Sequence, residues 1–475
     1  MNAILSMSSM IFPLITFKYV SGVLLPVGTG KVSFATSLVS YFALFAQLGI
    51  PTYGIRACAK VRDNKMELTR TAHELLTINL IMSFFAYVAF FLTIWLIPRF
   101  REDRGLYIVV SASMFLNAIG MEWLYKALEQ YTYITVRSII FKAIGVIAMF
   151  FLVHEQKDYV IYGGITIFAA SASNVFNFFN AHKYIKMYPV GEYHYKRHFR
   201  AVAVFFAMTC ATTIYTNLDT VMLGIMKTDA DVGYYHAAIR IKTILLSIVT
   251  SLGSVLLPRV SYYYQKGMIS EFYRINHKAI NFVFLIASPM ALYFILFAKY
   301  GIYFLSSDAF NGAIIPMQLI MPTLLIVGLT NITGIQMLVP MGREKTVLYS
   351  QIAGATTDLI LNLILIPKYA AAGAAFGTMM AEIAVLIVQQ IALNKEVTPA
   401  YKNVHYVPIV LGLLAGTAAS FWVPQLELSS FFTLAVSAIL FFGAYAIVLL
   451  LMREPLAVEV FGQFTDSLLS RRNHR

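Results

Sequence analysis

Charged residues are scarce in this chain. Asp, Glu, Lys and Arg together make up 12% of its 475 residues, whereas hydrophobic residues make up 59%. Soluble domains carry about 25% charged residues, so the chain has too few polar side chains to cover a surface that faces water. The composition therefore excludes a soluble globular protein and indicates an integral membrane protein whose main solvent is lipid.

Cysteine and long polar segments are also lacking. Cys58 and Cys210 are the only cysteines, which is too few for a disulfide framework, and we expect both to be small hydrophobic fillers. No secretory leader with a small-residue cleavage site is visible. No loop between apolar stretches is long enough to fold into a nucleotide-binding or catalytic domain. We therefore expect no enzyme and no cofactor, with H⁺ or Na⁺ as candidate coupling ions.

Long apolar stretches fill most of the chain. A membrane-crossing helix needs about 20 mostly apolar residues, and on that criterion the sequence predicts an all-α membrane protein with about 14 spans. The predicted spans are 5–26, 32–54, 73–97, 105–125, 136–153, 159–181, 201–225, 232–257, 279–298, 310–340, 346–366, 369–393, 404–424 and 428–452.

The basic residues of the loops predict the orientation. The formal net charge is +13, but most Lys and Arg residues lie in short loops, so they indicate orientation and not nucleic acid. Placing both termini in the cytoplasm puts most of these cations, Arg137 included, on the cytoplasmic side. His194 and His198 flank Lys196 and Arg197, and we interpret them as part of a basic cytoplasmic loop, not as a metal site.

Two stretches of the chain have the same order of spans and loops. Aligning Asn117 with Asn331 places Gly120 opposite Gly334 and Leu124 opposite Leu338. The repeat distance corresponds to six spans, an even number, so the two halves share one orientation, as in parallel transporter repeats. We predict a six-helix lobe at 1–195, a second at 196–400, two additional spans within 401–452, and a cytoplasmic interfacial tail at 453–475.

Ionisable residues inside predicted spans are the candidates for function. Such groups are costly in lipid and usually face a cavity. We predict a wet, basic cleft between the lobes that binds phosphate groups, with Arg240 preferred over its near neighbour Lys242 as the side chain that faces it. Internal ion pairs and cations that reach the headgroups are the alternative. The candidates for this cleft are Lys18, Arg56, Lys142, Arg240 and Lys242.

Four acidic residues are candidates for ion coupling. Glu122, Asp219, Asp358 and Glu382 lie within predicted spans, where a carboxylate can take up a proton or Na⁺. Asp219 is preferred because it is one of the most central.

Several motifs near the start resemble those of polysaccharide repeat-unit flippases. They are FPLITFKYVS at 12–21, GKVSFA at 30–35, GIPTYGIR at 49–56, VRD at 61–63 and EWLYKALEQY at 122–131, followed by Arg137. These flippases belong to the multidrug/oligosaccharidyl-lipid/polysaccharide exporter superfamily. The resemblance implies two six-helix lobes, alternating access and an undecaprenyl-pyrophosphate-linked oligosaccharide as substrate.

One departure from the family pattern concerns a candidate residue. The family usually has Pro at the position of Lys18 and Arg at the position of Gly22, whereas Arg56 matches the pattern. The expected partners are the lipid-linked oligosaccharide, membrane lipid, and a glycan polymerase and glycosyltransferases of the same pathway, in a bacterial inner membrane. Three alternatives stay open. They are a multidrug cation antiporter of the same superfamily, a membrane-embedded glycan polymerase or transferase, and a flippase for a peptidoglycan precursor or teichoic acid.

Overall fold

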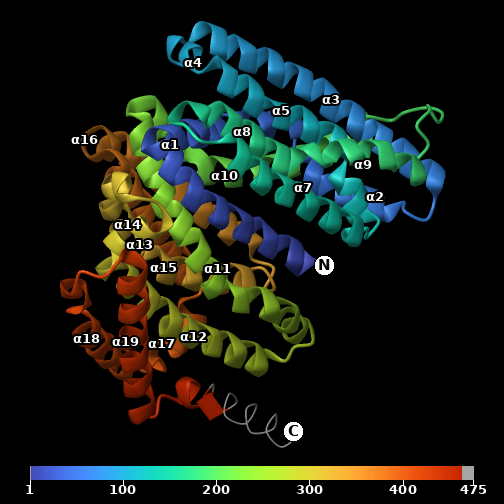
Figure 1. The fold of residues 1–475 in the computed structure, drawn as a ribbon. Coiled ribbons are helices and arrows are strands. Elements are labelled where there is room, and N and C mark those ends of the chain that lie inside the picture. Colours follow the sequence, from blue (N-terminus) through green and yellow to red (C-terminus); the bar gives the residue numbers. More distant parts are fainter. Residues whose placement is uncertain (1, 460, 463–475) are drawn as a thin grey trace, which may run out of the picture. The chain divides into compact units, whose positions relative to one another are not determined.

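The chain is helical throughout the part that the structure describes. The computed structural model describes residues 2–459 and 461–462, and the side chains among them other than those of 2–15, 252, 254 and 255. This described part contains helices and turns and no β-strand (Figure 1). The predicted all-α fold class is therefore confirmed.

The chain forms two compact units, Met1–His236 and Ala237–Arg475, here called unit 1 and unit 2. The helices that begin in unit 1 are α1 Asn2–Gln47, α2 Ile50–Lys60, α3 Lys65–Leu96, α4 Pro98–Glu102, α5 Arg104–Gly120, α6 Glu122–Ala127, α7 Tyr131–Leu152, α8 Tyr159–Ile167, α9 Asn174–Asn180, α10 Lys196–Met226 and α11 Asp229–Gln265, with short turns η1 Gln156–Asp158, η2 Phe168–Ala172 and η3 Ala181–Lys183.

Unit 2 contains the remaining elements. They are α12 Ile269–Leu296, α13 Ala298–Leu305, η4 Asp308–Ala313, α14 Ile314–Ile320, α15 Thr323–Thr330, η5 Asn331–Leu338, α16 Glu344–Ala392, α17 Asn394–Lys402, α18 Tyr406–Ser420, η6 Val423–Leu426 and α19 Ser430–Leu451. In unit 2, α16 packs on α14 and α15, and α18 pairs with α19.

Two very long helices are each broken in the middle. Leu25 in α1 and Ala370 in α16 have positive φ angles of 56° and 48°. Leu25 comes directly before Pro26, and a residue in that position is disfavoured in the helical conformation. Leu25 lies at the end of the predicted span 5–26, and Ala370 lies at the start of the predicted span 369–393, so each break is close to a predicted boundary between spans.

The number of spans follows from length and apolar character. Among the described residues nine helices are long and apolar enough to cross a membrane, or eleven if each bent pair is one span. Counting the two broken helices twice would add two, and the 17-residue helix α5 would add another. The predicted 14 spans are compatible with these helices, but the number stays a prediction.

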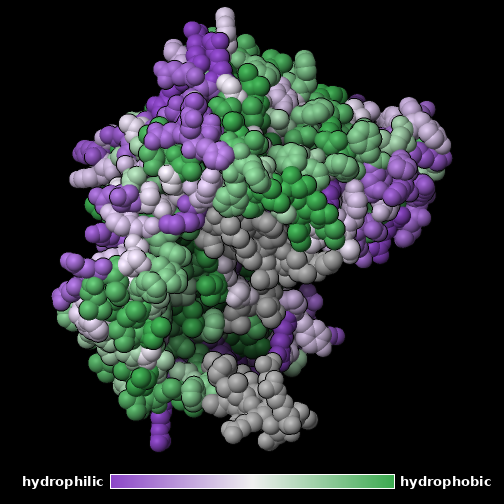
Figure 2. Space-filling view, viewed as in Figure 1, coloured by the Kyte–Doolittle hydropathy of each residue, from purple (hydrophilic) through white to green (hydrophobic). Residues whose placement is uncertain are grey.

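Large apolar side chains on the outside agree with a lipid environment. Phe84, Phe151 and Leu451 are 65%, 76% and 77% exposed, which is unusual in water for so many large side chains. Over unit 1, Figure 2 shows hydrophobic residues covering the middle of the helices and hydrophilic residues gathered at their two ends. This distribution is that of a multi-pass membrane protein.

Unit 1 is assembled around α1, which packs on α3, α5, α7, α8 and α10. The unit ends 41 residues beyond the predicted lobe boundary at 195/196, because α10 packs along α1 and α2. The structural units and the predicted sequence repeats are different divisions of the chain. The predicted lobes 1–195 and 196–400 and the additional spans in 401–452 therefore stay predictions.

A pair of glycines is consistent with the predicted repeat. A Cβ atom on Gly120 would lie 2.5 Å from Cγ of Asn174, and one on Gly334 would lie 3.0 Å from Nε2 of Gln389. Gly120 and Gly334 are opposite each other in the sequence alignment. Each therefore allows a helix to approach an amide side chain closely within its own unit.

The beginning of the predicted tail is held against unit 2. Oε2 of Glu454 accepts a hydrogen bond from the backbone N–H of Ala457 at 2.6 Å, and Lys278 of α12 forms an ion pair with Glu459 at 2.7 Å. Leu456 is buried. The rest of the predicted interfacial tail, 463–475, lies outside the described residues.

Candidate functional site

Three of the five predicted cleft cations lie in unit 1. Lys18 lies on the first half of α1 and is exposed, Arg56 lies on α2 and is exposed, and Lys142 is half-buried on α7. The described contacts do not bring these three cations together. The common cleft they were predicted to line therefore stays a prediction.

The other two predicted cations lie on the part of α11 that belongs to unit 2. Lys242 is only 9% exposed, whereas Arg240 is half-buried. The sequence favoured Arg240 as the side chain that faces the cleft, but the structure buries Lys242 more deeply. Both therefore remain candidates for binding an anionic group.

The four candidate coupling acids differ in their surroundings. Asp219 on α10 is 5% exposed and accepts a hydrogen bond from the hydroxyl of Tyr235. Glu382 on α16 is 8% exposed. Glu122 starts α6, is 38% exposed and forms an ion pair with Lys126 at 2.8 Å, which makes it the least buried of the four.

Asp358 lies beside a second oxygen-bearing side chain. Asp358 on α16 is 1% exposed, and Asn362, one turn later on the same helix, is fully buried. A Cβ atom on Gly377 would lie 2.5 Å from Oδ1 of Asn362 and 3.4 Å from Oδ1 of Asp358. Gly377 therefore lets the two halves of α16 approach each other at these oxygens.

A buried cation was missed in the sequence. The predicted orientation counts Arg137 with the cytoplasmic cations, and its side of the membrane stays a prediction. The structure shows that Arg137 lies inside α7, which begins at Tyr131, and is only 8% exposed. Its Nη1 donates to the carbonyl of Ser173 at 3.0 Å, and its guanidinium lies 5.8 Å from the ring of Tyr133. Its position inside the predicted span 136–153 was the signal that could have identified it.

A buried carboxylate was not among the predicted site residues. Glu74 on α3 is fully buried and accepts hydrogen bonds from Arg197 at 2.6 Å and from His198 at 2.7 Å. The sequence placed both partners in a basic loop, and no periodic pattern pairs residues more than 120 positions apart. His194 precedes α10, so it does not share a helix face with His198. In the described part of the chain, no group of three His, Cys, Asp or Glu side chains could hold a metal ion.

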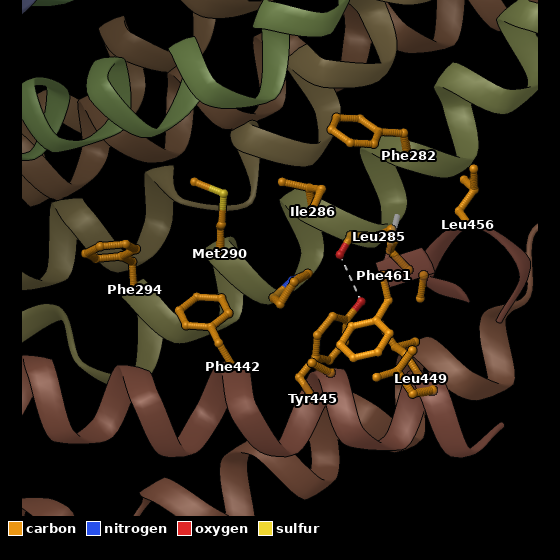
Figure 3. Close-up of a pocket in the computed structure, with 14 residues that line it drawn as sticks. Phe282, Leu285, Ile286, Met290, Phe294, Phe442, Tyr445, Leu449, Leu456 and Phe461 are labelled. Atoms are coloured by element: carbon orange, nitrogen blue, oxygen red, sulfur yellow. Dashed lines mark hydrogen bonds between the residues drawn. The ribbon is translucent and has the colours of Figure 1, made fainter. Parts of the chain in front are cut away.

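An apolar cavity of about 830 Å³ lies between α12 and α19 in unit 2 (Figure 3). Phe282, Met290, Phe442 and Leu449 line it, and Leu456 and Phe461 lie at the end near the tail. The hydroxyl of Tyr445 donates to the carbonyl of Leu285 at 2.9 Å, so this polar group is satisfied within the protein. The lining therefore suits hydrocarbon and not a charged headgroup.

The chain is similar to known transporters along most of its length. It is 21% identical over 382 residues to a protein of Escherichia coli (strain K12) named "Putative O-antigen transporter", covering 80% of this chain and 92% of that protein. This relative and the structural neighbours described below have the names of transporters and flippases and not of enzymes, as the sequence predicted.

Two solved structures share its fold. One is the lipid II flippase MurJ in an inward closed conformation, with a TM-score of 0.74, 16% identity, and coverage of 96% of this chain and 99% of that one. The other is an inward-facing multidrug resistance MATE family transporter, with a TM-score of 0.63, 14% identity, and coverage of 83% and 96%.

Two family profiles match the sequence. The MatE profile matches residues 205–364, and the profile described as "Polysaccharide biosynthesis protein" matches residues 1–263, which is more than half of the chain. The predicted resemblance to polysaccharide flippases of this superfamily is thus confirmed, and this multi-pass, all-helical membrane protein belongs to the polysaccharide biosynthesis protein family.

Proposed function

We propose that the protein is a flippase that carries an undecaprenyl-pyrophosphate-linked oligosaccharide across a bacterial inner membrane, with both of its termini in the cytoplasm. The observation that carries this proposal is the burial of cationic side chains within apolar helices. Lys242 is 9% exposed and Arg240 is half-buried on α11, and a cation in that position is retained at a cost in stability. A diphosphate group is an anion that such cations can bind.

The mechanism that we propose divides the substrate by polarity. Lys18, Arg240 and Lys242 bind the diphosphate, the glycan occupies the wet part of the same cleft, and the polyprenyl chain stays in lipid. Rocking of the two predicted lobes then exposes the headgroup on the other side of the membrane. A glycan polymerase and glycosyltransferases of the same pathway supply and consume the substrate.

The test is complementation of a strain that lacks its own repeat-unit flippase. Lys18→Ala and Arg240→Ala should each reduce surface glycan at an unchanged level of protein in the membrane, and the double variant should reduce it further. The matched control is Lys157→Ala. This variant removes an exposed cation that forms an ion pair with the exposed Glu155. Wild-type glycan in the double variant would contradict the proposed role of the cations.

Ion coupling is proposed at the buried acids, with Asp219 first and Asp358, Glu382 and Glu122 after it. Asp219 is nearly fully buried, and its partner Tyr235 has a hydroxyl that can adjust to a protonated or an ionised carboxyl. Asp219→Asn should abolish the response of transport to pH or to Na⁺. An unchanged response to both in this variant would exclude Asp219.

A second candidate function is multidrug cation export. It is favoured by the MatE profile over residues 205–364 and by the MATE structural neighbour. A cationic drug requires an acidic cleft, whereas this chain has a net charge of +13 and buried cations. Resistance to cationic dyes on overexpression, without complementation of glycan display, would favour this function over the flippase. Glycan elongation by the purified protein would instead indicate a polymerase or transferase.

A further inference from the structure

Glu74 is the centre of a buried polar network at one end of unit 1. Its side chain has no exposed surface. Oε2 accepts hydrogen bonds from Nε and Nη2 of Arg197 at 2.9 and 2.6 Å and from Nε2 of His198 at 2.7 Å. Oε1 accepts from the backbone N–H of His194 at 2.5 Å. This one carboxylate therefore joins α3 to the first turn of α10 and to the segment before it.

His198 extends the network to a third helix. Its side chain is 3% exposed, and Nδ1 lies 2.8 Å from the hydroxyl of Tyr53 on α2. The two rings are 5.6 Å apart and nearly perpendicular. Glu74, His198 and Tyr53 thus form a continuous hydrogen-bonded chain from α3 through α10 to α2.

The network is surrounded by a hydrophobic cluster. Apolar side chains of α2, α3, α6 and α10 pack there and include Ile50, Leu75, Trp123 and Val202. The charged groups nearest to the imidazole are Glu74 and Arg197, then Glu67 at 3.8 Å from Arg197, and Arg56 one turn from Tyr53 on α2. Water is therefore a poor substitute for a lost partner, and each hydrogen bond has to be kept within the protein.

The position of His198 permits two protonation states with different hydrogen bonds. Neutral imidazole can donate from Nε2 to Glu74 and accept at Nδ1 from the hydroxyl of Tyr53. Protonated imidazole donates from both nitrogens, so the hydroxyl oxygen of Tyr53 has to accept and its hydrogen has to turn away. Proton uptake therefore reverses the hydrogen bond between α10 and α2 and adds a positive charge beside Arg197.

We propose that Glu74, His198 and Tyr53 form a proton-binding site that controls how α2 is held against α3 and α10. The ligand is a proton, the group that takes it up is the imidazole of His198, and Glu74 balances the added charge. Tyr53 transmits the change to α2. This site shares no residue with the candidate cation cleft or with the acids proposed for ion coupling, so it stands independently of the transport function.

Trp123 is a natural reporter of α2. A Cβ atom on Gly54, the residue after Tyr53, would lie 2.8 Å from the Trp123 ring, so a shift of α2 changes the surroundings of the indole. The other two tryptophans, Trp95 and Trp422, are 64% and 40% exposed and can be replaced with Phe. The emission maximum of Trp123 in the purified full-length chain is then followed from pH 4.5 to 9.

The expected result is one transition within this pH range, because proton uptake by the imidazole reverses its hydrogen bond to Tyr53. His198→Gln should abolish it. His73→Gln is the matched control, because His73 is also bonded on both nitrogens, to Tyr193 at 3.0 Å and to the carbonyl of Lys186 at 2.8 Å, but to no carboxylate. This control should keep the transition and its midpoint.

Tyr53→Phe provides a second variant in case His198→Gln fails to fold. It keeps the ring but removes the hydroxyl that joins His198 to α2, so the amplitude of the Trp123 response should fall by at least half. Three results would overturn the proposal: no transition in the parent protein, a transition that persists in His198→Gln, or full amplitude in Tyr53→Phe. Loss of the transition in His73→Gln would also contradict the proposal, because it would assign the transition to His73 and not to His198.

Discussion

The two ends of unit 1 are held together by different kinds of interaction. At one end, the starts of α3 and α10 meet α2 around the buried Glu74; we call this the Glu74 end. At the opposite end, the break in α1 meets the start of α11 around Gly30; we call this the Gly30 end. Figure 1 shows α2 at the Glu74 end of the unit and α4, which contains Arg99, at the Gly30 end.

The Gly30 end depends on close backbone packing. A Cβ atom on Gly30 would lie 1.7 Å from the carbonyl oxygen of Asp229, and one on Gly233 would lie 2.1 Å from that of Pro26. Ion pairs surround this contact without being fully buried, with Lys31 at 2.9 Å from Asp103 and Arg99 at 3.4 Å from Asp229. Fit between two backbones, and not charge, holds this end together.

The comparison shows how one unit can respond differently at its two ends. The hydrogen bonds of a buried carboxylate with three partners are directional, and their pattern changes when a proton binds. A glycine contact has no titratable group and depends only on shape. If transport requires one end to open while the other stays closed, then a proton bound at His198 acts on the Glu74 end, whereas the glycine contact at the other end has no group to take one up.

The largest effect is expected from Glu74→Gln. This variant removes the fully buried charge that Arg197, itself 37% exposed, and the buried His198 share, and breaking such a pair costs up to about 3 kcal/mol of unfolding free energy. Thermal unfolding of the purified protein measures the loss. Labelling of Cys58, which is fully buried on α2, should become at least tenfold faster in a Cys210→Ala background, because 1.4 kcal/mol is worth a factor of ten.

Glu67→Gln is the control for this variant. Glu67 lies on the same helix two turns earlier, is 35% exposed and lies 3.8 Å from Arg197, so its removal should change stability by less than about 1 kcal/mol. Equal losses in Glu67→Gln and Glu74→Gln would show that general surface charge, and not the buried network, holds this end.

Sequence alone could predict the elements but not these two contacts. Apolar length predicted one span that ends at 26 and another that begins at 32, close to the break at Leu25, because this signal is local. Glu74 and His198 are 124 positions apart, and no local pattern selects which helix packs on which. Gly30 was read as part of a family motif, but its partner Asp229 is known only from the fold. Arg137 lies within the predicted span 136–153, but only the fold shows that its guanidinium donates to the carbonyl of Ser173, 36 positions later.

A smaller effect is expected from Gly30→Ala at the other end. The added methyl group overlaps a backbone carbonyl that cannot rotate away, so α1 and α11 have to separate, and overpacking of this kind costs about 1–3 kcal/mol. Thermal unfolding again measures the loss, but Cys58 labelling should stay at the parent rate, because the perturbed contact is at the far end of unit 1.

Gly22→Ala provides the control on the same helix. No atom lies within 4 Å of a Cβ placed on Gly22, and alanine is favoured over glycine in a helix by up to about 1 kcal/mol. This variant should therefore be neutral or slightly more stable. A destabilisation equal to that of Gly30→Ala would mean that helix flexibility, and not the contact with Asp229, determines the effect.

The smallest effects are expected from the outer ion pairs, and they compare the two ends directly. Lys31 and Asp103 are 22% and 13% exposed, and Tyr159 adds a hydrogen bond to Asp103 at 2.6 Å, so Lys31→Gln should cost up to about 1 kcal/mol. Arg62 and Glu129 at the Glu74 end are 46% and 72% exposed, and Arg62→Gln should cost almost nothing. Raising the salt concentration should reduce the difference between the two losses of unfolding free energy, because salt screens partly exposed charges. If Arg62→Gln proved the more costly of the two, exposed charge would contribute more to the Glu74 end than its buried network implies, and the contrast between the ends would have to be redrawn.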